Sequence, residues 1–291
     1  AADAADGGPL RREEEQWRAA IAEERLNRIK RFSGGVDHEG MTNKHLPTLS
    51  IQYCLDAAEI EITDVDLIVA STCVVVNYQN YSIRELTKSE VLEQLPADVD
   101  EGRVHIVGHH LGHAASAFYP SSFREAAILI VDGGGGLLPT GNGATSNQEL
   151  FEERVTVYHG DGDKIDVVKR YTDGVPSDGH LNNSEHCSLG DFYQSATLFA
   201  GFKSGDEGKT MGLAPYGTDR YYKDFLEAIK FQNGTMAIES SYQFNKWRKA
   251  AGTAYGGRYG NPGTGTGSPR ELDMDIAAAA QYALEEALIE I

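Results

Sequence analysis

Two histidines and an aspartate between Val104 and Gly136 have the residue types and the spacing of metal ligands. His109 and His113 lie four residues apart, so on a helix their imidazoles project from one face and can share an ion. Asp132 ends a buried apolar strand just before four glycines, where its carboxylate could add an oxygen ligand or face a nucleotide phosphate. The HxxxH spacing is also found in pairs of solvated or core histidines, so the pattern alone leaves both interpretations open.

A second segment that could bind a ligand begins with a predicted helix start near Ser188. Gly190 in the first turn would allow a ligand close to the backbone, and Asp191 follows it. Free N–H groups at such a helix start can hold a ribose or a phosphate. The sequence therefore makes this turn a candidate nucleotide contact.

The same segment continues through a glycine-rich stretch, Gly205 to Gly217, which we expect to be a turn. Asp206, Glu207 and Lys209 lie between its glycines, either facing a ligand or on a solvated loop. The phosphate-binding pattern GxxxxGK[ST] is missing, because no glycine stands five positions before Gly208. Lys209 is therefore not expected to be a Walker lysine.

The composition predicts a globular protein with one large or two ordinary domains. The chain has 291 residues, of which 41% are hydrophobic, and a formal net charge of −18 from 44 acidic and 26 basic residues. That charge argues against a nucleic-acid backbone as the main partner. The three cysteines show no CxxC spacing and no apolar run approaches the roughly 20 residues that span a bilayer, so we expect a cytoplasmic protein that is not in a membrane.

The elements that position these residues form two successive units with the same order. The first unit, residues 1–125, is expected to contain a strand, a helix and a strand, at Trp17–Ala22, Leu46–Ala58 and Asp66–Ser71. The second, residues 126–291, is expected to contain a strand, a hairpin and a helix, at Ala127–Asp132, Val155–His159 paired with Lys164–Tyr171, and Leu189–Ala200. A flexible loop, Thr253–Pro269, and a last helix, Asp275–Ile291, follow. Strands followed by a helix, repeated in each half, indicate an α/β chain with a duplicated actin-like ATPase fold.

Three blocks of the sequence are long and specific: AAIAEERLNRIKR; HHLGHAASAFY followed by a strand that ends VDG; and SLGDFYQSATLFAGFKSGDEGKTMGLAPYG. They resemble, in family order, the O-carbamoyltransferases of the nodulation and cephamycin type (NodU/CmcH), which include the tobramycin carbamoyltransferase. The resemblance implies an actin-like fold like that of the tRNA threonylcarbamoyl transferases. It also implies a later carbamoyl-adenylate synthetase-like domain, expected but absent from this chain.

The resemblance implies a two-step reaction. In the later domain, carbamoyl phosphate and ATP, with Mg²⁺, would give carbamoyl adenylate. The actin-like domain would then pass the carbamoyl group to a hydroxyl of a small-molecule natural product, with a homodimer left open as the assembly. A divalent metal could polarise the adenylate and orient its phosphate, and a mixed nitrogen and oxygen ligand set suits iron first, then manganese or zinc.

The resemblance also assigns residues to roles. His109, His113 and Asp132 would hold the metal, while a further aspartate ligand would lie beyond Ile291. The expected nucleotide contacts, at the ribose and the phosphate, are Gly190, Asp191, Gly133 and Gly134.

Three further residues are candidates for catalysis. His110 is either an acceptor-side general base or a structural neighbour. Lys209 could meet phosphate or the carbamoyl oxygen, and Lys30 could meet the carbonyl or be solvated.

The chain departs from the family pattern at several places. A first strand with a histidine and an aspartate is not visible before AADAADGG, and LLPTGNGATSNQE replaces an aromatic continuation after the glycines. The chain starts without a methionine and its last helix stops while the apolar pattern is still running, so both ends look cut and the fold is expected to be incomplete at each end. Two other functions stay open: a tRNA threonylcarbamoyl transferase-like enzyme, which the negative charge disfavours, and a non-catalytic actin-like nucleotide-binding protein.

Overall fold

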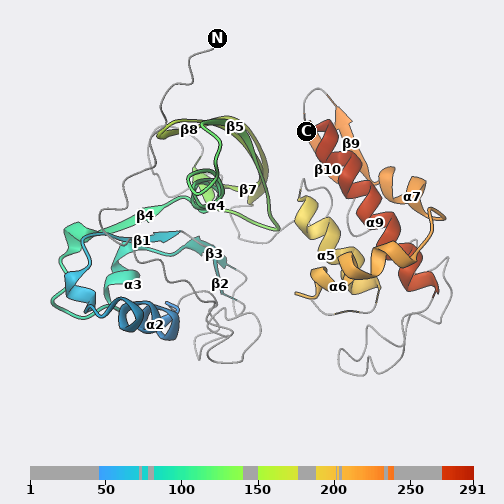
Figure 1. Ribbon diagram of the computed structural model, residues 1–291. Helices are drawn as coiled ribbons and strands as arrows, with labels where there is room; N and C mark the ends of the chain where they lie inside the picture. Colours follow the sequence, from blue (N-terminus) through green and yellow to red (C-terminus); the bar gives the residue numbers. More distant parts are fainter. Residues whose placement is uncertain are drawn as a thin grey trace, which may run out of the picture.

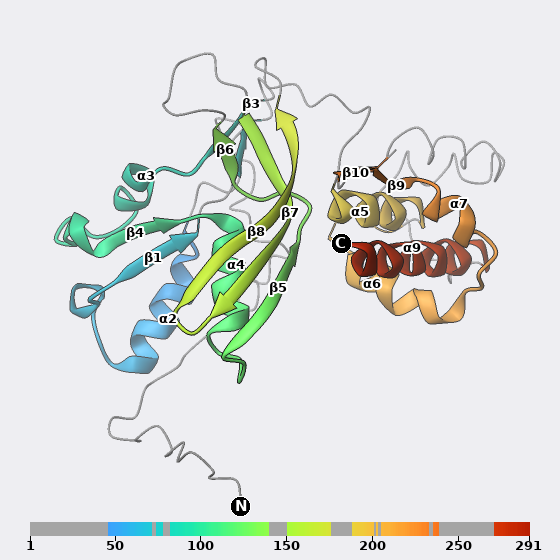
Figure 2. The same cartoon turned by 90° about the horizontal axis from the view of Figure 1, so that it is seen from above.

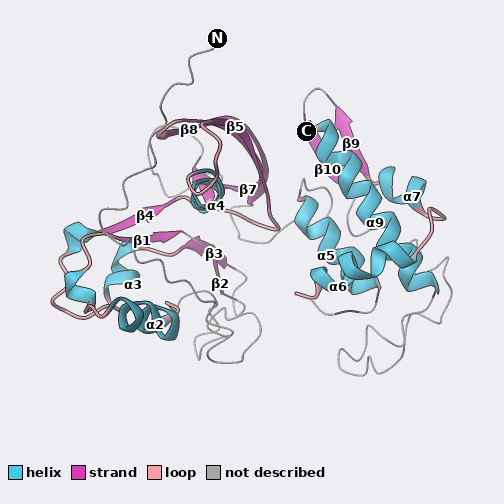
Figure 3. Cartoon of the chain, viewed as in Figure 1, coloured by secondary structure: helices cyan, strands magenta, loops and turns pink. Residues whose placement is uncertain are grey.

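The computed structural model describes residues 46–71, 74–77, 82–139, 150–175, 188–200, 202, 205–232, 235–238 and 271–291. Helices and strands are mixed along the chain (Figures 1 and 3), which confirms the predicted α/β class. The duplicated actin-like arrangement and the division at residue 125 stay predictions. Among the described residues, no helix is long and apolar enough to cross a membrane.

The first part of the structure is a small parallel strand pair with short helices beside it. Strand β1 (Ile68–Ser71) pairs with β4 (Val104–Val107) in parallel, which requires the connection between them to cross back to the end of the sheet where β1 begins. Val104 packs with Leu86 and Val91 in a small buried cluster. The neighbouring elements are α2 (Thr48–Ala58), the hairpin of β2 (Val74–Asn77) and β3 (Ser82–Glu85), and α3 (Lys88–Leu92).

The central feature is an antiparallel sheet organised around one long strand. Strand β7 (Leu150–Asp161) pairs along one edge with β5 (Glu125–Val131) and then with β6 (Leu137–Pro139), and along its other edge with β8 (Lys164–Val175). Figure 2 shows the long β7–β8 hairpin. Its two-residue turn has Gly162 at φ +60°, a conformation that glycine adopts without strain.

Strands β5 and β6 leave a gap between them on β7. Val131 pairs with Val155, whereas Leu137 pairs with Glu152, so the five residues 132–136 face only Glu153 and Arg154. The extra length makes the segment after Asp132 bow out from the sheet. We call residues 132–136 the glycine turn.

Strand β7 contains a β-bulge opposite the glycine turn. Glu153 pairs with Thr172 of β8 and Val155 with Tyr171, so Arg154 is the extra residue. A bulge breaks the alternation of side chains, and as a result Arg154 and Val155 both face helix α5 (Leu189–Phe199).

Helix α4 (His109–Phe118) carries the two predicted metal-binding histidines and packs against the sheet. Ala114 and Phe118 form a buried cluster with Ile128 of β5 and Tyr158 of β7. On the side of β1, a Cβ on Gly112 would lie 3.0 Å from the Ser71 hydroxyl, so the glycine permits this close approach.

The last part of the structure is helical. Helix α9 (Glu271–Glu290) buries an alanine-rich face against α5, and its small side chains allow the helices to approach closely. The other elements here are α6 (Glu207–Leu213), the 3₁₀ helix η3 (Ala214–Tyr216), α7 (Tyr222–Leu226) and the hairpin of β9 (Ile229–Gln232) and β10 (Thr235–Ile238). Val155 of β7 and Tyr171 of β8 join the same core, which ties α5 to the sheet.

Most predicted elements are confirmed, with shifted ends. The predicted strand at Asp66–Ser71 and the helix at Leu46–Ala58 each begin two residues later, and the last helix begins at Glu271 rather than Asp275. The expected turn in Gly205–Gly217 is wrong, because residues 207–213 form helix α6. The predicted strand Trp17–Ala22 and the loop Thr253–Pro269 lie outside the described residues.

Candidate metal centre

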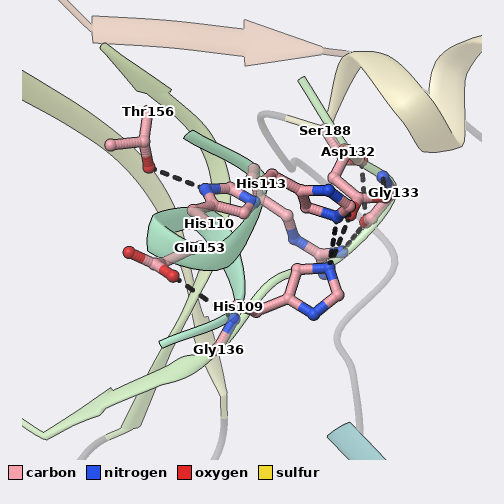
Figure 4. A network of polar contacts seen from close by, with 10 residues as sticks. His109, His110, His113, Asp132, Gly133, Gly136, Glu153, Thr156 and Ser188 are labelled. Carbon is pink, nitrogen blue, oxygen red and sulfur yellow. Dashed lines mark hydrogen bonds and ion pairs between the residues drawn. The ribbon is translucent and has the colours of Figure 1, made fainter. Parts of the chain in front are cut away.

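The structure brings His109, His113 and Asp132 together at the surface between helix α4 and the end of β5 (Figure 4). The Nε2 atom of His109 lies 2.8 Å from Asp132 Oδ2 and 3.1 Å from the Nε2 atom of His113. The third distance, from His113 Nε2 to Asp132 Oδ2, is 3.5 Å. The HxxxH spacing therefore places both imidazoles on the helix face that meets the aspartate.

The three side chains fit a divalent metal. With ligand bonds of about 2.1 Å, neighbouring ligand atoms lie roughly 3.0–3.4 Å apart, close to the distances seen here. This is the one group of three or more potential ligands among the described residues. The exposed fractions are 21% for His109, 34% for Asp132 and 52% for His113, so the ligand atoms can be reached from solvent. A mixed imidazole and carboxylate set suits iron, manganese or zinc.

Asp132 is held in its charged form. Burial raises the pKa of its carboxyl group, but hydrogen bonds from His109 and from the Gly133 N–H outweigh this, so the pKa lies below the usual value. Oδ1 accepts the Gly133 N–H at 2.7 Å, which leaves Oδ2 directed at the two imidazoles. An ionised carboxylate is the form that binds a metal.

His110 points away from the other two histidines on helix α4, into the core. Its side chain has no exposed surface, and Nδ1 lies 2.7 Å from the Thr156 hydroxyl. Its Nε2 atom lies next to Gly135, where a Cβ would come within 2.6 Å. Burial lowers the pKa of His110 to about 4, despite the nearby Glu153 and Asp132. This arrangement favours the structural interpretation of His110 over the general-base one.

The glycine turn is held by the N-terminus of helix α5. Ser188 caps this helix, accepting the Asp191 N–H at 3.0 Å, and its own hydroxyl lies 3.0 Å from the Gly133 carbonyl oxygen. A Cβ on Gly190 would overlap the backbone of Asp132 and Gly133. The prediction that Gly190 leaves room for a ligand therefore needs correction, since the protein backbone fills that space.

Beneath the glycine turn lies a buried ionic cluster around Arg154. Its guanidinium contacts Glu152 at 2.9 Å, Asp173 at 2.8 Å and Asp191 at 3.4 Å, and it also donates to the Gly133 carbonyl oxygen. Burial raises the pKa of Glu152 to about 7, and the charges of Asp191, Asp173 and Asp132 act in the same direction, although Arg154 opposes them. One cation thus binds three carboxylates here.

The expected nucleotide contacts Gly133 and Gly134 lie over this cluster. A Cβ on Gly134 would overlap the Glu152 carboxylate, and one on Gly133 would lie 3.5 Å from Asp191 Oδ1. Asp191 itself is bound to Arg154 and is 38% exposed. The glycines at 134 and 190 therefore permit close packing of the protein, while Gly133 and Asp191 are partly exposed.

Of the two candidate lysines, the structure describes Lys209 only. Lys209 lies on helix α6, where its ammonium group pairs with Asp206 at 3.0 Å. Its side chain is 58% exposed and lies over the ring of Phe202, 6.0 Å from the ring centre. Lys30 lies outside the described residues.

Sequence reasoning missed Arg154 and Thr156, which contact the turn and His110. Both belong to the run EERVTVY, in which three charged residues precede an alternating apolar pattern. Charges at that position predict a strand end, whereas in the structure Glu152, Glu153 and Arg154 are buried inside strand β7. The available signal in the sequence was the run of three charged residues joined directly to a strand pattern.

Comparison with known proteins identifies relatives of this chain. The family described as carbamoyltransferase N-terminus matches residues 71–291. The chain is 32% identical over 240 residues to the nodulation protein NolNO of Sinorhizobium fredii, covering 76% of this chain and 29% of that protein. It is 32% identical over 126 residues to the nodulation protein NolO of Bradyrhizobium diazoefficiens, covering 42% of this chain and 17% of the relative.

A longer match is found with an uncharacterized protein, sll1178, of Synechocystis sp.. It is 27% identical over 306 residues, covering 94% of this chain and 44% of that protein. The chain therefore spans less than half the length of each of these curated relatives.

Proposed function

This chain belongs to the carbamoyltransferase family, and we propose that the protein containing it is a metal-dependent O-carbamoyltransferase. It would move a carbamoyl group from carbamoyl adenylate, made from carbamoyl phosphate and ATP, to a hydroxyl of a small-molecule natural product. The observation that carries this proposal is the solvent-accessible triangle of His109, His113 and Asp132. We further propose that the chain is part of a duplicated actin-like fold and that the protein is cytoplasmic.

His109, His113 and Asp132 would hold the divalent ion, with iron the first candidate and manganese or zinc the alternatives. When bound, such an ion supplies a Lewis acid and a template for the nucleotide phosphate. The chain's own contribution is orientation. Asp132 is fixed through the Gly133 N–H, and helix α4 is fixed against the sheet by Ala114 and Phe118.

In the transfer step, the acceptor oxygen forms a bond to the carbamoyl carbon, and the bond from that carbon to the adenylate oxygen breaks. AMP leaves with the electron pair, and the hydroxyl proton must pass to a base. Because His110 is buried, we propose that its role is to support helix α4 through Thr156. Ligands would approach from the side of His113, which is the most exposed of the three metal-binding residues.

A tRNA threonylcarbamoyl transferase-like enzyme is the second candidate, because that reaction would use the same kind of site. A formal charge of −18 disfavours this candidate, because a negatively charged protein repels the phosphate backbone of tRNA. Salt-dependent tRNA binding by the full-length protein would favour this candidate. A non-catalytic nucleotide-binding protein would bind ATP without consuming carbamoyl phosphate.

The test is an assay of the full-length protein with carbamoyl phosphate, ATP and a panel of natural-product alcohols, followed by the mass gain of the acceptor. Wild-type protein should carbamoylate at least one alcohol, and His109→Ala should abolish transfer. His159→Ala is the matched control, because this histidine also pairs with a carboxylate, Glu125 at 2.9 Å, but lies at the other end of the sheet. Equal transfer by the wild type and His109→Ala would rule out the proposed site.

A further inference from the structure

Arg154 occupies an unusual position for a charged residue. It is the extra residue of the bulge in β7, it is 6% exposed, and its guanidinium lies beneath the glycine turn. A guanidinium offers five donors in a rigid plane, so it can bind several oxygen atoms in fixed directions. Here it binds three carboxylates and one backbone carbonyl oxygen.

Arg154 holds the peptide group before Asp132 and the peptide group after Gly133. Its backbone carbonyl oxygen accepts the Asp132 N–H at 3.2 Å. Its side chain donates to the carbonyl oxygen of Gly133, the residue that follows. Because Asp132 Oδ1 accepts the N–H of Gly133, the orientation of this turn sets the direction of Oδ2 toward the histidines.

The same guanidinium connects the turn to helix α5. It contacts Asp191 in the first turn of that helix, while Ser188, the N-cap, donates to the Gly133 carbonyl oxygen as well. Two donors from different elements thus converge on one carbonyl oxygen next to the metal ligand. Glu152 contacts a second nitrogen of the guanidinium, Nη2, at 2.9 Å, and Asp173 contacts Nε at 2.8 Å.

We propose that Arg154 is a positioning residue for the metal ligand Asp132, acting through the Gly133 carbonyl oxygen, and that it links the metal centre to the start of helix α5. This inference rests on the proposed metal site. Partners that orient a metal ligand typically change metal affinity by 10–100-fold when they are removed. The residue itself has no contact with the metal or the substrate.

The experiment is a titration of the full-length protein with Co²⁺, measuring both the dissociation constant and the visible absorption spectrum of the bound ion. Arg154→Met should weaken Co²⁺ binding at least tenfold and alter the spectrum. The Co²⁺ affinity of Arg154→Lys should lie between those of Arg154→Met and the wild type, because an ammonium group has its three donors on one nitrogen and cannot bridge four oxygens held around a plane. Ser188→Ala should also raise the dissociation constant for Co²⁺, but by a smaller factor than Arg154→Met.

The matched control is Arg170→Met. Arg170 pairs with Glu153 at 2.9 Å on the same hairpin but does not contact Gly133, so Co²⁺ affinity and spectrum should stay as in the wild type. Urea unfolding of each variant without metal separates stability from binding. A purely structural Arg154 would lower stability but leave the Co²⁺ constant of the folded protein unchanged.

The outcomes are distinct. If Arg154→Met does not fold, the Co²⁺ affinities of Arg154→Lys and Ser188→Ala test the inference in its place. Wild-type Co²⁺ affinity in these folded variants would overturn the inference and leave the proposed function standing. A wild-type protein that binds no Co²⁺ would instead overturn the metal site of the proposed function, and this inference with it.

Discussion

Replacing Glu152 by glutamine should change how the stability of the protein depends on pH. Glu152 is buried beneath the glycine turn and its pKa is raised from 4.5 to about 7, with burial as the main cause. The folded protein therefore holds the Glu152 proton more tightly than the unfolded chain does. Stability from this group is fully present below pH 4.5 and is lost as the pH rises through about 7.

The size of the effect follows from the two pKa values. Each pH unit between them is worth about 1.4 kcal/mol, so the wild type should lose roughly 2–3 kcal/mol from this group between pH 5 and pH 8. Glutamine keeps the shape and cannot ionise, so Glu152→Gln lacks this loss. The difference in unfolding free energy between variant and wild type should shift by that amount in favour of the variant at pH 8.

The assay is urea unfolding of both proteins at pH 5 and pH 8, with a chelator present so that metal binding does not contribute. Glu93→Gln, which removes an exposed carboxyl group, controls for the loss of one acid. Other titrating groups cancel, because variant and wild type are compared at each pH. The same difference at both pH values would refute the view that Glu152 is protonated in the folded protein near neutral pH.

Three further predictions concern the metal centre and the turn that supports it. Chelation should lower the unfolding temperature of the metal-loaded wild type but not that of His109→Ala, because ligands from α4 and from the turn after β5 would both be released. Calorimetry measures this temperature, and an equal fall in the two proteins would contradict the site. Gly190→Ala should destabilise the protein by about 2 kcal/mol in urea unfolding, because its Cβ overlaps the Gly133 backbone, and unchanged stability would show that the turn can move aside. Asp132→Ala in the full-length protein should stop acceptor carbamoylation while pyrophosphate release from ATP and carbamoyl phosphate continues; loss of both activities in a folded variant would mean that the two half-reactions are not separable.

The candidate metal centre could be predicted because its geometry is local. His109 and His113 need only a helix to share a face, and Asp132 needs only to end the following strand. The two elements then meet because the strand packs on the helix, through contacts such as Phe118 with Ile128. The resemblance to carbamoyltransferases, which the family match bears out, rested on the same block of sequence.

Other features depend on contacts between distant segments, which no local pattern encodes. Gly190 suggests room for a ligand when it is read in isolation, but in the structure its space is filled by Gly133, 57 residues earlier in the sequence. The stretch from Gly205 to Gly217 looks like a turn by composition, yet residues 207–213 form helix α6, packed on α9. Tertiary packing overrides the low helix propensity of glycine there.

Strand β7 was predicted only from Val155 onward, because the charged residues before it break the alternation. The structure explains the break, since the bulge at Arg154 shifts the phase of the strand by one residue.

This phase shift has a consequence for insertions and deletions. A strand assigns its side chains to two faces by parity, so adding or removing one residue exchanges the faces for everything on one side of the change. In β7 the bulge lies between Glu153, next to His110, and Val155, next to helix α5. Arg154 is exempt from this rule, because deleting it would give a regular strand in which Glu153 and Val155 still face opposite sides, so Glu152 and Glu153 would keep their present faces. The surplus residue in the ladder thus adds a cation on the α5 side of the sheet without exchanging the faces of the carboxylates before it.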